Sequence, residues 1–237
     1  MEFYFKTTSS KLSSSGETSK KPDLIQNEKD RAKYDEFNAS LTQIEIANHS
    51  VWRHKKSFRI ALISIFSALA VVLGYILAYL PNVELFTLII FLSGFVLSKK
   101  EGLLIGFLSS LIFTFFNPLG TSPPPLFLYQ ITHYSFTGFL GGLVNDYFKT
   151  KKYYKPNDDL YIFKIMLIFG IIGGLITFFY DILSTLIGGF LVSFKIEYFV
   201  ATYLTGIVFT SVHLVGNILG FVLILPGLIQ IIIKLLD

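Results

Sequence analysis

Four polar side chains share one face of an apolar stretch in the middle of the sequence. Gln130, His133, Tyr134 and Thr137 stand at positions i, i+3, i+4 and i+7, which lie on one side of an α-helix. Their amide, imidazole and hydroxyl groups can donate and accept hydrogen bonds. Because such groups are costly inside a bilayer, each of them indicates a functional site.

Two later apolar stretches carry polar faces of their own. One presents Asp181 together with Thr177, Ser184 and Thr185, and the other presents Thr210, His213 and Asn217. A buried carboxylate needs a partner, and the nearest groups by expected depth are the two histidines and Tyr180. The three faces overlap in depth, which indicates one polar cavity that is open to the outside.

Structural explanations compete with this interpretation. Serine and threonine in membrane helices often bond their own main chain, so Thr177, Ser184 and Thr210 are weak evidence. Asn217 is as typical of a hydrogen bond between helices as of a ligand contact. Each histidine could equally be a satisfied core residue. Asp181 is the hardest of these groups to explain by structure alone.

The composition indicates an all-α integral membrane protein. The chain has 237 residues, of which 52% are hydrophobic and 15% are charged, and its 25 phenylalanines add to the apolar runs. Apolar runs of about 18 or more residues are typical of membrane helices. The absence of cysteine excludes disulfides and cysteine metal ligands. No other metal site or cofactor is indicated, and membrane topology explains the net charge of +4 better than nucleic-acid binding does.

Two domains follow from the change in composition. Residues 1–50 are polar and predict a disordered cytoplasmic extension, with a possible short surface helix over residues 24–48. Residues 51–237 predict a compact domain of six transmembrane helices. Their expected ranges are 58–80, 84–98, 102–116, 125–148, 161–192 and 198–234. The second and third are short for a bilayer core of about 30 Å, so either they do not cross alone or the bilayer is thinned.

The distribution of lysine and arginine predicts the orientation. Six crossings place one set of basic residues on the same side, namely Arg53, Lys55, Lys56, Arg59, Lys99, Lys100, Lys149, Lys151, Lys152, Lys155 and Lys234. The positive-inside rule makes that side cytoplasmic, so both termini are expected in the cytoplasm. The opposite side then holds the turn at residues 81–84, the loop at residues 117–124 and a turn whose only cation is Lys195.

The two larger features of that outer side look like parts of a binding site. The loop "NPLGTSPPP" is stiffened by its prolines, so it would lose little entropy on closing over a ligand. The turn "PNVE" offers the amide of Asn82 and the carboxylate of Glu84. We expect the loop to act as a lid, although a simple connector is the alternative.

The first helix carries two stripes of small residues. Ala70, Gly74 and Ala78 repeat every fourth residue, and Ser64 and Ala68 form a parallel pair. Small residues allow another helix to approach closely. Each stripe could therefore pack inside the protein or dock a partner subunit, and the sequence does not choose between them.

Several motifs are missing. The sequence has no phosphate-binding loop of the form GxxxxGK[ST], no GxSxG elbow and no HExxH zinc helix. We therefore expect no catalytic activity and no ATP hydrolysis of this kind by the chain itself. No obvious repeat of interrupted helices supports an inverted-repeat secondary transporter.

The region from about residue 58 to residue 234 resembles the substrate-binding S components of energy-coupling factor (ECF) vitamin transporters. The resemblance lies in the "PNVE" turn, the "NPLG…PPP" loop, "FFYDILSTLIGGF" and "HLVGNILGFVLILP". It implies six membrane helices and capture of a vitamin or related micronutrient on the outer half. It also implies a membrane coupling (T) protein and two ABC ATPases as partners, and toppling in the membrane to release the ligand. The long polar extension departs from the family.

The resemblance and the polar faces together predict the site residues. The expected substrate-binding residues are Asn82, Glu84, Asn117, Tyr129, Gln130, His133, Thr137, Tyr180, Asp181, His213 and Asn217. The partner-docking candidates are Ser64 and Ala68, or Ala70, Gly74 and Ala78. The main alternative is a stand-alone proton-coupled carrier that uses Asp181 and a histidine as its relay. Membrane enzymes and structural scaffolds are less well supported. The sequence leaves the identity of the ligand open among flavins, thiamin, folates, corrinoids and their precursors.

Overall fold

The computed structural model describes residues 31–38, 55–80, 84–117, 120–156, 159–191 and 195–236. By its contacts the chain divides into two units, Met1–Asn48 and His49–Asp237. In the first unit, residues 31–38 form a helix inside the stretch where a surface helix was expected. The remainder of the expected N-terminal extension lies outside the described residues.

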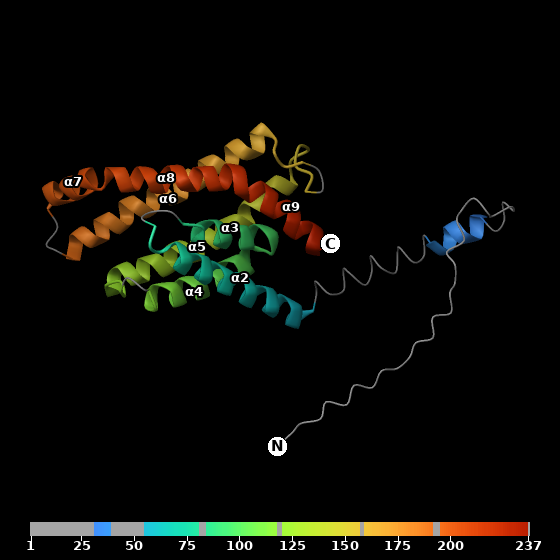
Figure 1. Ribbon diagram of the computed structural model, residues 1–237, viewed down its shortest axis with the longest axis horizontal. Coiled ribbons are helices and arrows are strands. Elements are labelled where there is room, and N and C mark those ends of the chain that lie inside the picture. The colour runs from blue at the N-terminus through green and yellow to red at the C-terminus, as the bar shows by residue number, and fades with distance from the viewer. Residues whose placement is uncertain are drawn as a thin grey trace, which may run out of the picture. The chain divides into compact units, whose positions relative to one another are not determined.

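The described part of the second unit is all-helical, as predicted, and its helices form one bundle (Figure 1). In chain order these elements are α2 (Lys56–Leu77), α3 (Phe86–Val96), α4 (Lys99–Phe115), α5 (Pro124–Lys149), α6 (Phe163–Leu191), α7 (Ile196–Thr205), α8 (Ile207–Leu219), the π-helix η2 (Gly220–Ile224) and α9 (Leu225–Leu236). Three helical stretches are long and apolar enough to cross a membrane: Lys56–Leu77, Phe163–Leu191 and Ile207–Leu236.

Helix α3 is the centre of the bundle. All 11 of its residues are buried, and α2, α4, α5 and α9 pack around it. A helix that is apolar on every side belongs in a protein core. At about 1.5 Å per residue it is about 16 Å long, roughly half of the bilayer core.

Glycines bring α3, α4 and α5 into main-chain contact. A Cβ atom on Gly138 of α5 would collide with the main chain of Gly102 in α4, and one on Gly94 of α3 would collide with Gly138. Gly106 lies equally close to the carbonyl of Tyr134. Close approach through small residues is a common way to pack helices in lipid. These contacts determine where the polar face of α5 lies relative to α3.

Phenylalanine fills the remainder of the core. Phe91 and Phe95 of α3 contact Phe169 of α6, with ring centroids 6.4 and 5.6 Å apart. Phe148 of α5 and Phe221 of η2 join the same cluster, at 5.2 Å from Phe169 and 5.1 Å from Phe91. Tilted and edge-to-face pairs at such distances are favourable. The large phenylalanine content therefore has a structural use in this bundle.

The expected sixth helix, 198–234, is not continuous, so this prediction was wrong. Gly206 ends α7 and begins α8, consistent with the low helix propensity of glycine. Further along, η2 precedes Pro226, and the N–H of Leu225 bonds to the carbonyl of Gly220. Because proline cannot donate to the preceding turn, a local π-helical adjustment accommodates it.

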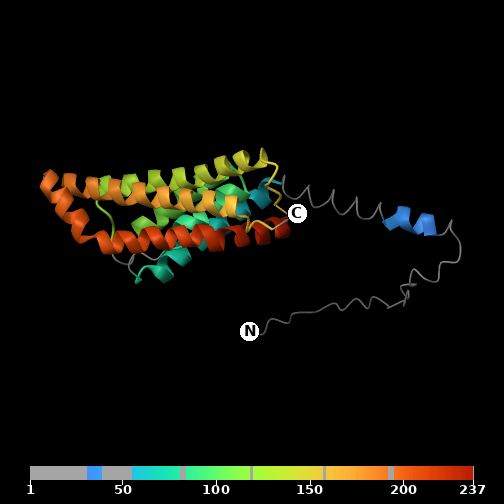
Figure 2. The ribbon, with the colours of Figure 1, turned by 90° about the horizontal axis from the view of Figure 1, so that it is seen from above.

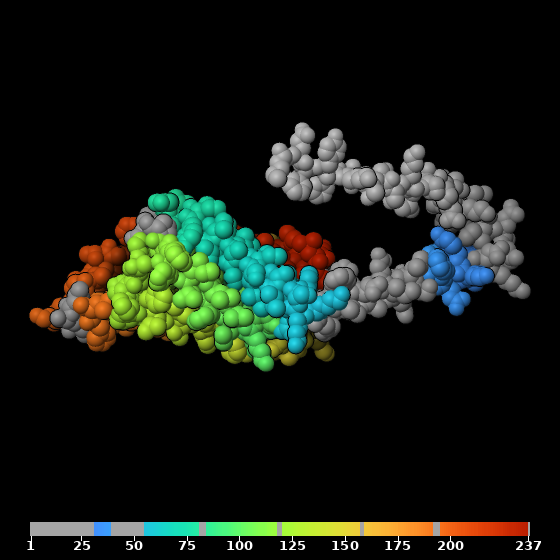
Figure 3. Space-filling view, turned by 90° about the horizontal axis from the view of Figure 1, so that it is seen from below, coloured from blue at the N-terminus to red at the C-terminus, as the bar shows by residue number. Residues whose placement is uncertain are grey.

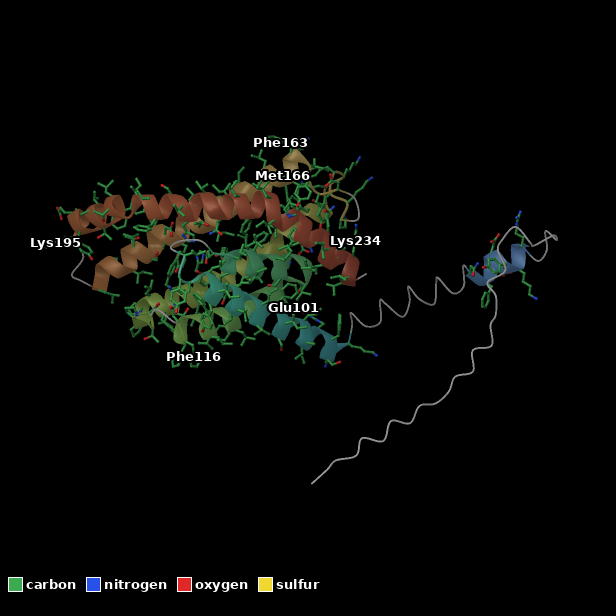
Figure 4. The ribbon with its side chains drawn as sticks, in the orientation of Figure 1. Glu101, Phe116, Phe163, Met166, Lys195 and Lys234 are labelled. Carbon is green, nitrogen blue, oxygen red and sulfur yellow. The ribbon has the colours of Figure 1, made fainter. Side chains whose placement is uncertain are left out.

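The two longest helical stretches run together along one side of the bundle. Helix α6 lies beside α8 in both ribbon views and packs against it (Figures 1 and 2). The chain reverses between them near Lys195. Lys195 lies at one end of the bundle, and Lys234 and Glu101 lie toward the other (Figure 4).

Candidate functional site

A histidine between two carboxylates forms the centre of the site. His213 Nδ1 of α8 lies 2.9 Å from Asp181 Oδ1 of α6. His213 Nε2 lies 3.0 Å from Oε1 of Glu84, which stands two residues before the start of α3. The side chains of His213, Asp181 and Glu84 are 9%, 12% and 21% exposed. The expected partnership between Asp181 and a histidine is thus present, and His213 is that histidine.

Two neutral side chains complete the surroundings of Glu84. Asn217 Nδ2, one turn after His213, donates to Glu84 Oε1 at 3.3 Å, and the Thr87 hydroxyl donates to the same oxygen at 2.5 Å. Glu84 also stands at the amino end of α3, where a helix dipole stabilises negative charge. In the described ranges, no group of three His, Cys, Asp or Glu side chains is arranged to hold a metal ion.

Tyr180 connects this group to the polar face of α5. Gln130 Nε2 donates to the Tyr180 hydroxyl at 2.9 Å. The Tyr180 ring is stacked on Tyr129, with centroids 6.0 Å apart and planes at 25°, and its centroid lies 5.0 Å from that of His133. On its other side it meets His213 edge-on at 6.0 Å. The polar faces predicted on three helices therefore do converge in space.

The proline loop is tied to the same place. The Ser122 hydroxyl donates to Gln130 Oε1 at 2.9 Å. At the other end of the loop, the carbonyl of Asn117 accepts a bond from the Gly120 N–H at 3.0 Å. Gly120 has a φ of 107°, a conformation that favours glycine. The described residues of the loop thus make specific hydrogen bonds, one within the loop and one to α5.

The predicted residues differ in how directly they join this cluster. Glu84, Tyr129, Gln130, His133, Tyr180, Asp181, His213 and Asn217 lie in it through the contacts above. Thr137 is buried, but its hydroxyl donates to the carbonyl of His133 at 3.0 Å, so it serves its own helix. Asn117 belongs to the loop turn. Asn82 lies outside the described residues.

Two members of the cluster were missed as site residues. Thr87 is one of them. Its position three residues after Glu84, at the start of a helix, could have indicated its role. Tyr134 is the other: its ring packs edge-on to Phe86 at 4.8 Å and lies 5.7 Å from Tyr180. Its helical spacing had already placed Tyr134 on the polar face of α5, but it was not included among the expected substrate-binding residues.

The two small-residue stripes of α2 have different environments. Ala70 is 0% exposed, and a Cβ atom on Gly74 would come within 2.8 Å of the Phe113 ring of α4. Of the two alternatives for this stripe, packing inside the bundle therefore applies to Ala70 and Gly74, which are not available as a docking surface. Ala78 is half-buried, whereas Ser64 and Ala68 are exposed. Figure 3 shows α2 at the surface, beside α4.

The comparisons with known proteins give one clear result. A family model described as ECF transporter, substrate-specific component, matches residues 58–236. Searches of curated proteins and of solved structures gave no match. The family match covers well over half of the 237 residues and includes every helix from α3 to α9. The chain belongs to the family of substrate-specific components of ECF transporters.

Proposed function

We propose that the chain captures a vitamin or a related micronutrient in the cluster around His213 and delivers it inward. The supporting observation is the convergence of Glu84, Asp181 and His213 beneath the aromatic side chains of α5 and α6. Charged groups inside a membrane protein are costly. Binding of a substrate, the activity of the family, would explain why this protein has them. The chain binds its ligand without transforming it.

The delivery step needs partners. A membrane coupling protein and two ABC ATPases would supply the energy, since the sequence has no phosphate-binding loop of its own. We place the docking surface for the coupling protein on the exposed pair Ser64 and Ala68. Around this pair, Ile65 and Leu69 are 60% and 41% exposed, which suits close packing of a second helix in lipid.

The proposed topology has six crossings, with both termini in the cytoplasm and the proline loop outside. The basic residues between α5 and α6 support it through the positive-inside rule. Because the chain contains no cysteine, single cysteines can report on it directly. In intact cells a membrane-impermeant maleimide should label Thr121→Cys but not Lys152→Cys, both of which replace exposed residues. The reverse pattern would invert the topology.

The central experiment is mass spectrometry of small molecules released from the purified protein. Release of a vitamin or precursor in stoichiometric amount would establish capture and identify the ligand. A protein that carries nothing, and whose melting temperature does not change with any vitamin tested, would contradict capture.

A second function is favoured by one observation. His213 contacts Asp181 at 2.9 Å and Glu84 at 3.0 Å. A proton relay also requires ionisable side chains that are connected in this way. A stand-alone proton-coupled carrier would transport its substrate in liposomes containing this chain alone, and a proton uncoupler would abolish that transport. Transport that requires the coupling protein and ATP would exclude the carrier.

A further inference from the structure

The charge of the cluster can be counted from its hydrogen bonds. A neutral imidazole has only one N–H, yet both ring nitrogens of His213 lie within 3.0 Å of carboxylate oxygens. One further proton must therefore sit on the ring or on one of the carboxyl groups of Glu84 and Asp181. With that single further proton, wherever it rests, the three side chains together carry one net negative charge.

In the part of the chain that the structure describes, no lysine or arginine pairs with Glu84 or Asp181. Within the described ranges, His213 is the only cationic side chain that pairs with Glu84 or Asp181. The remaining bonds to Glu84 come from neutral Thr87 and Asn217. An uncompensated charge is expensive in a membrane interior. A positively charged ligand would complete such a site electrostatically.

Among the described residues, three buried side-chain polar atoms have no hydrogen-bond partner. Two of them belong to this cluster, Oδ2 of Asp181 and Nε2 of His133, on the two helices whose side chains meet at Tyr180. An ionised carboxylate oxygen only accepts hydrogen bonds, and leaving it unpaired costs free energy. A ligand N–H would satisfy Asp181, and a ring nitrogen or amino group of the same ligand would satisfy His133.

Aromatic rings lie next to these residues in the cluster. Tyr129 and Tyr180 are stacked, and His133 is tilted at 59° to Tyr180. Aromatic faces stack on planar ligands and attract cations. A flexible or anionic ligand gains little binding energy from such faces. The neighbouring carboxylates would also repel an anionic ligand.

Resting on the proposed function, we infer that the ligand is a flat nitrogen heterocycle that carries a positive charge. Asp181 Oδ2 binds its N–H or cationic centre, and the tyrosine and histidine rings stack on its plane. Anionic compounds, including phosphorylated ones, are rejected by the same net charge. Specificity by charge thus follows from the arrangement of three ionisable side chains.

An equimolar mixture of six vitamins tests whether the ligand is a cationic heterocycle. The full chain, purified in detergent, is incubated with thiamin and pyridoxamine as cations, riboflavin and pyridoxine as neutral rings, and folate and pantothenate as anions. Retained compounds are then identified by mass spectrometry. Selective retention of a cation is expected. Preferential retention of a neutral or anionic compound would overturn the charge class but leave capture intact, whereas retention of none would contradict both.

Two variants connect the result to the site. Asp181→Asn should lower the affinity for the retained cation by about 10- to 100-fold, the effect of losing a charged hydrogen bond. Asp146→Asn is the matched control, because Asp146 is an exposed carboxylate paired with Lys99, about 20 Å along α5 from His133. Equal affinity in the wild type and in Asp181→Asn would overturn the role of this carboxylate.

Discussion

Glu84 and His213 are 129 residues apart in the chain, yet Glu84 Oε1 lies 3.0 Å from His213 Nε2. This contact joins the amino end of the buried helix α3 to α8. His213 in turn bonds Asp181 of α6. A single imidazole therefore holds three separate parts of the bundle together, and the site and the fold share the same residues.

His213→Ala should destabilise the protein. The change leaves two largely buried carboxylates without their cation, and removing one partner of a buried pair costs about 3–5 kcal/mol. Thermal unfolding in detergent, without ligand, measures the effect. The triple variant Glu84→Gln, Asp181→Asn and His213→Gln has no buried charge and should recover part of the loss. An unchanged melting temperature in His213→Ala would contradict a structural role for this contact.

Gly138→Ala should weaken the packing of α4 against α5. The added Cβ atom would overlap the main chain of Gly102, and overpacking costs about 1–3 kcal/mol. Gly188→Ala is the control, because a Cβ atom there meets nothing within 4 Å. The control should keep or slightly raise the stability. Equal melting temperatures for the two variants would mean that the α4 and α5 main chains are not in close contact.

Ala68→Leu should abolish co-purification with the coupling protein and leave ligand binding intact, because Ala68 is exposed. Ala70→Leu should instead lower the melting temperature, because Ala70 is 0% exposed and has no room for a larger side chain. Pull-down of the coupling protein and ligand binding are measured on both variants. Retained assembly in Ala68→Leu would place the docking surface elsewhere.

Glu101→Gln should loosen the attachment of α2 to α4. Glu101 is 6% exposed, accepts a hydrogen bond from Ser98 and pairs with Arg59. Losing a charged bond costs about 1–3 kcal/mol, and the lower end applies because the Arg59 side chain is 53% exposed. The melting temperature should fall, whereas in Asp146→Asn, which removes an exposed carboxylate, it should not. A similar response in both would rule out a special role for Glu101.

Much of the fold could be predicted from local pattern. Apolar runs marked the helices, and the expected ranges of the first five agree with α2 to α6 to within a few residues. The break of the sixth at Gly206 was missed because a glycine in an apolar helix can be tolerated or can end it. Only the packing of α7 and α8 decides between these outcomes.

Helical spacing also predicted which polar residues share a face. It placed Gln130 and His133 together, and likewise His213 and Asn217, because residues three or four apart lie side by side on any helix. It could not show that Asp181 bonds His213 rather than His133, since depth in the membrane does not specify which helices are neighbours.

The sequence by itself determined the class of protein, the helical segments and the polar face of each helix, because these depend on residues close together in the chain. The tertiary structure alone decided that α3 is a buried core helix and that Ala70 and Gly74 face inward. It also decided that Glu84, Asp181 and His213 form one charged group. The physical reason is that each of these depends on contacts between segments far apart in the chain, which the packing of glycine and phenylalanine sets.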